Sequence, residues 1–269
     1  MTWPYDLDGF RDIAIAQAIR DGAWTNDPFY RGEFAWYNPL VPATISLTAL
    51  ATGLPMHSAY VGTGLWLNSF IPVVYFGCAR RLLGTWPALA ATCAFLFLPG
   101  SAPAWASATY SPWLFPAVTA QVPFYVGLWA WLSTLERVHL LRLVGCGILL
   151  GVTFLAHSAP AMLLGGIMLA TAYMASGASR QSQFAHTVIV IAVPFVVAFV
   201  VVAPFLLPIF TRYSFQVLNR APATWVYEAA HPYGILAGAA RASAVTNLIV
   251  AGTGIAWAYR HVSKASRVV

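Results

Sequence analysis

The stretch QSQFAHTVIVIAVPFVVAFVVVAPFLLPIFT, from Gln181 to Thr211, contains no Asp, Glu, Lys or Arg. Three further runs, 34–79, 82–135 and 143–179, are free of the same four residue types. Of the 269 residues, 59% are hydrophobic and 8% are charged, whereas a soluble domain carries roughly 25% charged residues. Because a charge inside the hydrocarbon core of a bilayer is costly, these runs predict an all-α, polytopic membrane protein.

The charged residues divide unequally along the chain. Residues 1–38 hold six of the eight acids and three arginines, which gives this segment a net charge of −3. The rest holds two acids and eleven Lys and Arg residues, a net charge of +9. These bases are scattered singly between apolar runs, so we interpret them as determinants of membrane orientation. Despite a pI near 9.4, we expect no nucleic acid as a partner.

Composition divides the chain into four segments. We predict an acidic outer loop with an amphipathic helix, a juxtamembrane or re-entrant segment, a transmembrane helix bundle and a cytoplasmic tail. Their ranges are 1–38, 39–56, 57–260 and 261–269. Within the second segment, the apolar run Leu40–Gly53 is 14 residues long, shorter than the roughly 17 residues that a span needs. The bundle comprises about seven spans. The predicted spans are Ser58–Ala79, Trp86–Pro99, Ala117–Leu135, Leu143–Ala156, Ala161–Ala175, Phe184–Phe210 and Gly234–Tyr259.

Within the outer loop, apolar residues recur at helical spacing over Phe10–Asp21, and Gly22 follows as a stop signal. We predict an amphipathic helix here, with Asp8 as its N-cap. Asp6 and Asp8 also form the strongest acidic pair for chemistry. Two carboxylates at this spacing can bind a divalent cation, and one can act as a base toward a hydroxyl. Both interpretations, helix cap and chemical site, are open.

Lys and Arg are enriched in loops that face the cytoplasm. Four basic segments of this chain fall on one face if the predicted spans follow Leu54 and Leu40–Gly53 does not cross. Those segments contain Arg80 and Arg81, Arg137 and Arg142, Arg180, and the tail residues Arg260, Lys264 and Arg267. The acidic N-terminal segment and the loops 100–116 and 212–233 then share the outer face. Export of that segment requires a preceding helix, which we expect to be missing from this chain.

Six short motifs follow one another along the chain. They are YDLDGF at 5–10, AIRDG at 18–22, DPF at 27–29, WYNPL at 36–40, CARRLLG at 78–84 and LLGVTFLAHSAPAMLL at 149–164. In this order they resemble the GT-C superfamily of membrane glycosyltransferases, of the mannosyltransferase and aminoarabinose-transferase type. These polytopic enzymes use polyprenyl-phosphate sugars. The resemblance covers about residues 6–170 and implies a GT-C-like helix bundle that moves a sugar to an acceptor hydroxyl.

The resemblance also implies roles for particular residues. The family's catalytic acid lies in the first outer loop and falls on Asp6 or Asp8, with Asp8 preferred because it is nearer to the helix. The same pair is the candidate metal site, for a divalent cation. His157 takes the place of a family lysine, and a leaving lipid phosphate requires cations and polar groups nearby. The candidate substrate- or phosphate-binding residues are His157, Arg212, Arg220, His231, Tyr37 and Asn38.

One departure from the family's pattern matters. Many members have a second acid in the next outer loop, whereas residues 100–112 contain none. Asp6 and Asp8 then act together, or metal dependence is lost, or the chain is an inactive scaffold of the same superfamily. The alternative from another class is a transporter or flippase-like protein, which is expected to show paired repeats with broken helices. The expected partners are a lipid-linked sugar donor, an acceptor of unknown identity and membrane lipid, at a bacterial plasma membrane.

Overall fold

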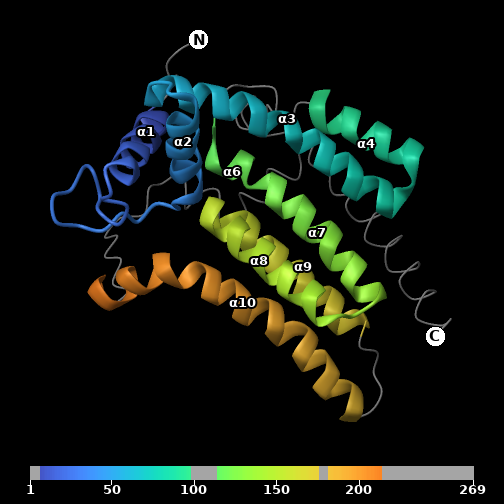
Figure 1. Cartoon of the computed structure of the whole chain (residues 1–269). Helices are drawn as coiled ribbons and strands as arrows, with labels where there is room; N and C mark the ends of the chain where they lie inside the picture. Colours follow the sequence, from blue (N-terminus) through green and yellow to red (C-terminus); the bar gives the residue numbers. More distant parts are fainter. Residues whose placement is uncertain (1–6, 98–113, 176–180, 214–269) are drawn as a thin grey trace, which may run out of the picture.

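A computed structural model describes residues 7–97, 114–175 and 181–213. These residues are mostly helical, and the only β pairing among them is an isolated bridge between Asn26 and Phe34. The predicted all-α class is therefore confirmed for the described part of the chain. Figure 1 shows the helices stacked into a bundle, with a smaller helical unit at the N-terminal side.

The smaller unit contains helix α1 (Leu7–Arg20) and helix α2 (Leu40–Thr52), which lie side by side (Figure 1). A helix is present where one was predicted over Phe10–Asp21, and Gly22, whose φ of 81° favours glycine, follows its end. Its buried face differs from the predicted apolar face, because Phe10 is exposed and Asp12 is buried. The N-cap prediction for Asp8 is wrong, because α1 begins at Leu7 and Asp8 lies in its first turn. An acid in this turn is still favourable, since it faces the positive end of the helix dipole.

Helix α2 occupies the segment that we predicted to be too short to cross a bilayer. Its 13 residues span about 20 Å at 1.5 Å per residue, against a hydrocarbon core of about 30 Å. Val41, Ile45 and Ala49 form its buried face and pack in one cluster with Ala16 of α1 and Tyr60 of the next helix. α2 is thus attached to the bundle and to α1 at the same time.

The bundle is formed by seven helices in the described ranges. They are α3 (Met56–Leu83), α4 (Thr85–Phe97), α6 (Pro116–Thr119), α7 (Gln121–Glu136), α8 (Leu140–Ala156), α9 (Ser158–Ala175) and α10 (Gln181–Tyr213). Two of the described helices, over Met56–Leu83 and Thr187–Tyr213, are long and apolar enough to cross a membrane by length and composition. α4, α8 and α9 are apolar but shorter.

Helix α8 lies at the centre and packs against α7, α9 and α10. Two glycines allow its close approach to α10. A Cβ added at Gly147 would lie 2.6 Å from the carbonyl oxygen of Pro194, and one added at Gly151 would lie 2.8 Å from the Cβ of Val201. Small residues four apart let two helix backbones approach in this way. The α8–α10 contact therefore depends on the absence of side chains at these two positions.

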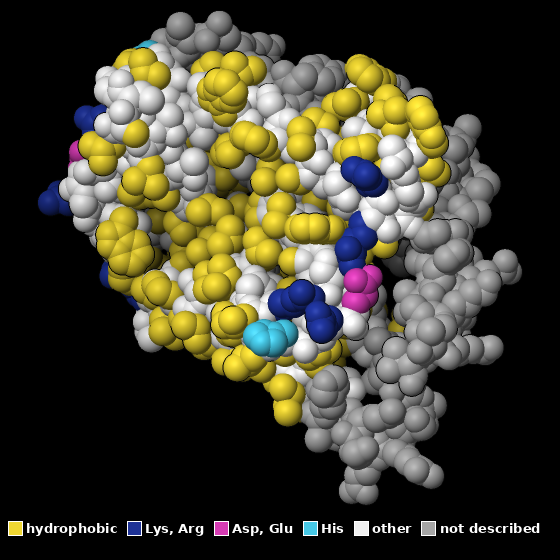
Figure 2. Space-filling model, turned by 45° about the vertical axis from the view of Figure 1, so that its right-hand side comes forward, with side chains coloured by type: hydrophobic (Ala, Val, Ile, Leu, Met, Phe, Trp, Pro, Cys, Tyr) yellow, Lys and Arg dark blue, Asp and Glu magenta, His cyan; other side chains and the backbone are white. Residues whose placement is uncertain are grey.

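Basic side chains gather at one end of the bundle, which we call the basic end. Arg81 of α3 forms an ion pair with Glu136 of α7, with 2.6 Å between Nη2 and Oε2. Arg142 of α8 donates to the carbonyl oxygens of Ser133 and Arg137 at 3.2 and 3.5 Å. Figure 2 shows Arg side chains grouped with one acidic side chain and one histidine, with hydrophobic side chains around the group. The structure thus brings together three arginines that we predicted to share a face.

Candidate functional site

The opposite end of the bundle, which we call the acidic end, joins segments that are far apart in the sequence. Phe34 donates its backbone N–H to the hydroxyl of Tyr213 at 2.9 Å, and that hydroxyl donates to the Glu33 carboxylate. Arg212 donates from Nη2 to the carbonyl oxygen of Gly32 at 2.6 Å. The loop between α1 and α2 is thereby fastened to the last turn of α10.

A second connection reaches the junction of α8 and α9. Asn38 donates from Nδ2 to the carbonyl oxygen of Phe154 at 2.5 Å. Phe154 lies in the last turn of α8, and His157 follows as its C-cap. The sequence-predicted residues Asn38, His157 and Arg212 therefore all lie at the acidic end, on three different elements.

The acidic end also carries a charged cluster, formed by Asp8, Arg11 and Asp12 of α1 and by Tyr37 of the loop between α1 and α2. The guanidinium of Arg11 lies 2.9 Å from Oδ1 of Asp8, and its Nε and Nη2 lie 3.3 Å from Oδ1 of Asp12. The Cζ atom of Arg11 lies 3.6 Å from the centroid of the Tyr37 ring, within the range of a cation–π interaction. One arginine thus joins two carboxylates and one aromatic ring.

The two carboxylates of this cluster differ in exposure. The side chain of Asp8 is 55% exposed, whereas that of Asp12 is 1% exposed. A buried carboxylate requires a close cation or several hydrogen bonds, and Arg11 supplies the cation. Asp12 therefore holds Arg11 in place from inside, and Asp8 is the carboxylate that an external substrate can reach.

Asp12 is a site residue that the sequence prediction missed. The sequence held a signal, because Asp12 lies three and four residues before the apolar Ile15 and Ala16, a spacing that puts all three on one face of a helix. A carboxylate on the apolar face of an amphipathic helix is unusual.

Of the divalent-cation site predicted at Asp6 and Asp8, the structure describes only Asp8. Asp6 lies outside the described residues, so the predicted pair with Asp8 stays a prediction. Within the described ranges, no group of three or more His, Cys, Asp or Glu residues is arranged to hold a metal ion. At Asp8 a positive charge is already present, since Arg11 contacts Oδ1 at 2.9 Å.

His157 is half-buried between α8 and α9. Its Nδ1 accepts a hydrogen bond from the backbone N–H of Ala159 at 3.2 Å, so the proton of the neutral ring lies on Nε2. Burial lowers the pKa of the His157 imidazole below its ordinary value. A neutral His157 can donate one hydrogen bond to a phosphate oxygen but brings no charge, which changes the role we expected for it.

The other predicted binding residues have contacts of several kinds. Arg212 is exposed and its Cζ lies 5.1 Å from the centroid of the Phe34 ring; its bond to Gly32 uses one of the five guanidinium N–H donors. The Tyr37 ring contacts the guanidinium of Arg11, and the Asn38 amide donates to the carbonyl oxygen of Phe154. Arg220 and His231 lie outside the described residues.

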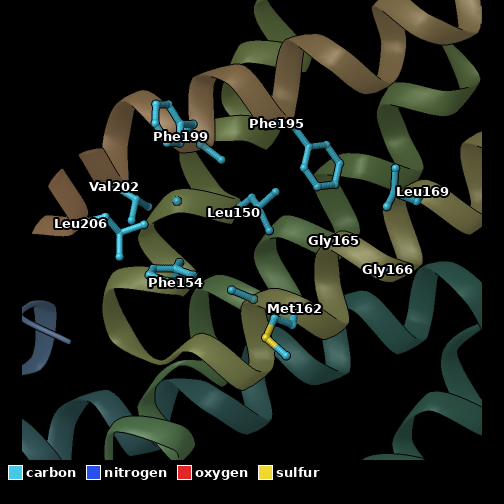
Figure 3. Close-up of a pocket in the computed structure, with 13 residues that line it drawn as sticks. Leu150, Phe154, Met162, Gly165, Gly166, Leu169, Phe195, Phe199, Val202 and Leu206 are labelled. Carbon is cyan, nitrogen blue, oxygen red and sulfur yellow. The ribbon is translucent and has the colours of Figure 1, made fainter. Parts of the chain in front are cut away.

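A cavity of about 510 Å³ opens between α8, α9 and α10 (Figure 3). All its lining residues are apolar or glycine, and Figure 3 shows Phe154, Met162, Phe195 and Phe199 around it. One of these, Phe154, is the residue whose carbonyl oxygen is bonded by Asn38. The cavity therefore starts at the acidic end and extends along the apolar helices.

No family model, curated protein or solved structure matches this chain.

Proposed function

We propose that this chain is a multi-pass membrane glycosyltransferase of GT-C type. It carries about seven spans, in a bacterial-type plasma membrane, and moves a sugar from a polyprenyl-phosphate donor to an acceptor hydroxyl at the outer face. The observation that carries the proposal is the cluster of Asp8, Arg11, Asp12 and Tyr37. It lies at the acidic end, which also contains His157, Arg212 and the start of the large apolar cavity.

Asp8 is the proposed general base. Its exposed carboxylate accepts the proton of the acceptor hydroxyl, while Arg11 fixes the orientation of the carboxylate through the 2.9 Å contact. The acceptor oxygen attacks the anomeric carbon of the sugar, the bond from this carbon to the phosphate oxygen breaks, and polyprenyl phosphate leaves. Because the donor is already activated, the reaction needs no nucleotide-binding domain.

The leaving phosphate requires stabilisation of its negative charge. Arg212 supplies a guanidinium, which suits phosphate geometry, and His157 supplies a neutral Nε2–H donor. The cavity between α8, α9 and α10 accommodates the apolar chain of the donor, because its walls are free of polar side chains. The same cavity would also suit a lipid flippase, which is the second candidate function.

Sugar transfer from a radiolabelled polyprenyl-phosphate donor in membranes that contain the full-length protein tests the proposal. We expect Asp8→Asn to lower turnover at least about 100-fold, the contribution of a general base, and Asp6→Asn to lower it less. Asp21→Asn is the matched control, since Asp21 is an exposed acid in the same segment that accepts hydrogen bonds from Gln17. If both Asp8→Asn and Asp6→Asn keep wild-type turnover, the proposed mechanism is wrong. Lipid translocation without any sugar transfer would favour the flippase.

A further inference from the structure

The basic end carries more positive charge than its own acid neutralises. Its arginines are Arg80 and Arg81 in the last turn of α3, Arg137 directly after α7, and Arg142 in the first turn of α8. Glu136 is the acid beside them, and residues 34–227 contain no other Asp or Glu. The four arginines and this acid give the group a net charge of +3. Such a group attracts an anionic ligand.

The contacts within the basic end leave guanidinium donors available. Arg81 is held by Glu136, and Arg142 donates from Nη1 to the carbonyl oxygens of Ser133 and Arg137. Its other guanidinium nitrogens lie next to the same turn. Arg80 and Arg137 are exposed, and neither forms an ion pair with the described residues. Because Glu136 joins Arg81 to the residue before Arg137, the arginines of the three helices form one group.

Two leucines are exposed in the middle of this group. Leu140 is 61% exposed and Leu141 is 74% exposed, and both lie in the first turn of α8, directly before Arg142. Every residue of the connection 136–142 is exposed. The turn has a defined conformation, because Nδ1 of His139 accepts a hydrogen bond from the backbone N–H of Leu141 at 3.3 Å. The basic end therefore presents apolar and cationic side chains together, as Figure 2 shows.

This combination restricts the class of ligand. A soluble anion or a nucleic acid can pair with the arginines, but it leaves Leu140 and Leu141 in water. A phospholipid matches both features, because its acyl chains cover the leucines and its phosphate lies beside the guanidinium groups, which suit phosphate geometry. A zwitterionic headgroup leaves the charge of +3 unbalanced, whereas a headgroup with a net negative charge offsets part of it. The charges therefore favour an anionic phospholipid.

We propose that the basic end is a binding site for an anionic phospholipid of the cytoplasmic leaflet. Arg137, with the remaining donors of Arg142, binds the headgroup phosphate, and Arg80 adds positive charge. Leu140 and Leu141 pack against the acyl chains. The inference rests on the membrane placement in the proposed function, in which this end faces the cytoplasm, and does not depend on sugar transfer.

The test measures lipid binding to the full-length protein in detergent by native mass spectrometry. Phosphatidylglycerol and phosphatidylcholine with identical acyl chains are added separately, and the Kd of the first bound lipid is compared. We expect phosphatidylglycerol to bind at least about tenfold more tightly. The double variant Arg80→Gln/Arg137→Gln should weaken phosphatidylglycerol binding about 25-fold, because each base near an anionic headgroup contributes about fivefold. It should leave phosphatidylcholine binding unchanged. Leu141→Ser should weaken the binding of both lipids alike, since both offer the same acyl chains.

The matched control is the double variant Arg20→Gln/Arg31→Gln, which loses the same charge at two exposed arginines away from the basic end. It should bind phosphatidylglycerol like the wild type. Asp8→Asn should do the same, and no sugar donor is present, which separates this inference from the catalytic proposal. Equal affinity of the wild type for the two lipids would overturn the inference, as would equal weakening in the two double variants. Displacement of the lipid by an equal concentration of soluble glycerol phosphate would also overturn it, because the ligand would then be a free anion.

Discussion

The acidic and basic ends of the bundle both carry ion pairs, but they hold them differently. At the basic end, Arg81 pairs with Glu136, whose side chain is 72% exposed, and the connections between helices are short. At the acidic end, Arg11 pairs with a carboxylate that is 1% exposed, and bonds such as that between Tyr213 and Phe34 join distant parts of the chain. Exposed arginines are sufficient to set the orientation of helices in a membrane. A catalytic site requires charged side chains that neighbouring groups hold in a fixed position.

The sharpest expected difference between the two ends concerns their arginines. Arg11→Met removes the cation beside the buried Asp12 and should destabilise the protein by about 3–5 kcal/mol, the cost of breaking a buried pair. Arg81→Met breaks an exposed pair and should cost about 0–1 kcal/mol. Unfolding of both variants in detergent, against the wild type, measures these costs. Equal losses would show that the two ends do not differ.

The attachment of α10 to α8 sets where Arg212 and Tyr213 lie. Gly147→Ala places a Cβ 2.6 Å from the Pro194 carbonyl oxygen and should destabilise the protein by about 1–3 kcal/mol. Gly145→Ala is the matched control, because no atom lies within 4 Å of an added Cβ there. The same unfolding assay applies. A Gly147→Ala variant as stable as Gly145→Ala would contradict the close packing.

The fastening of the loop at the acidic end depends on the hydroxyl of Tyr213. Tyr213→Phe removes the bonds to Phe34 and Glu33 and should cost about 1–2 kcal/mol, mostly as faster hydrogen exchange in the loop between α1 and α2. Tyr30→Phe, at an exposed position in the same loop, should leave exchange unchanged. Equal exchange rates in the two variants would remove the evidence for a fixed acidic end.

The smallest effect is expected from pH. The pKa of His157 is lowered by burial, so the unfolded chain binds a proton more readily than the folded one. The ordinary pKa of a histidine is about 6.5. Well above this pH, protonation of His157 costs the folded chain no stability, and stability is lost as the pH falls below about 6.5. His157→Asn keeps an acceptor for the Ala159 N–H and should flatten the acid side of the stability profile. An unchanged profile would contradict a buried, neutral His157.

The sequence predicted the features that depend on hydrophobic pattern. The all-α class, the helix before Gly22 and the short α2 follow from apolar spacing and glycine, which act locally. It did not predict features that depend on packing between distant segments. The hydrogen bonds between Tyr213 and Phe34 and between Asn38 and Phe154 become visible only when distant segments are placed side by side.

The candidate site shows the same division. Asp8, Tyr37, Asn38, His157 and Arg212 were selected by type and order, and the structure gathers them at one end. Their individual roles depend on neighbours that no local pattern reveals. His157 was expected as a phosphate ligand, and its burial makes it a neutral donor.

We place the chemistry of the proposed glycosyltransferase at the acidic end. Asp8 and Glu136 offer a matched pair, because both are exposed carboxylates in ion pairs with arginine, at opposite ends of the bundle. The most direct measurement is the ratio of sugar-transfer rates of Asp8→Asn and Glu136→Gln in the same membranes. We expect a rate at least about 100-fold lower for Asp8→Asn than for the wild type, and a rate close to the wild type for Glu136→Gln. Equal rates, or a loss confined to Glu136→Gln, would contradict it.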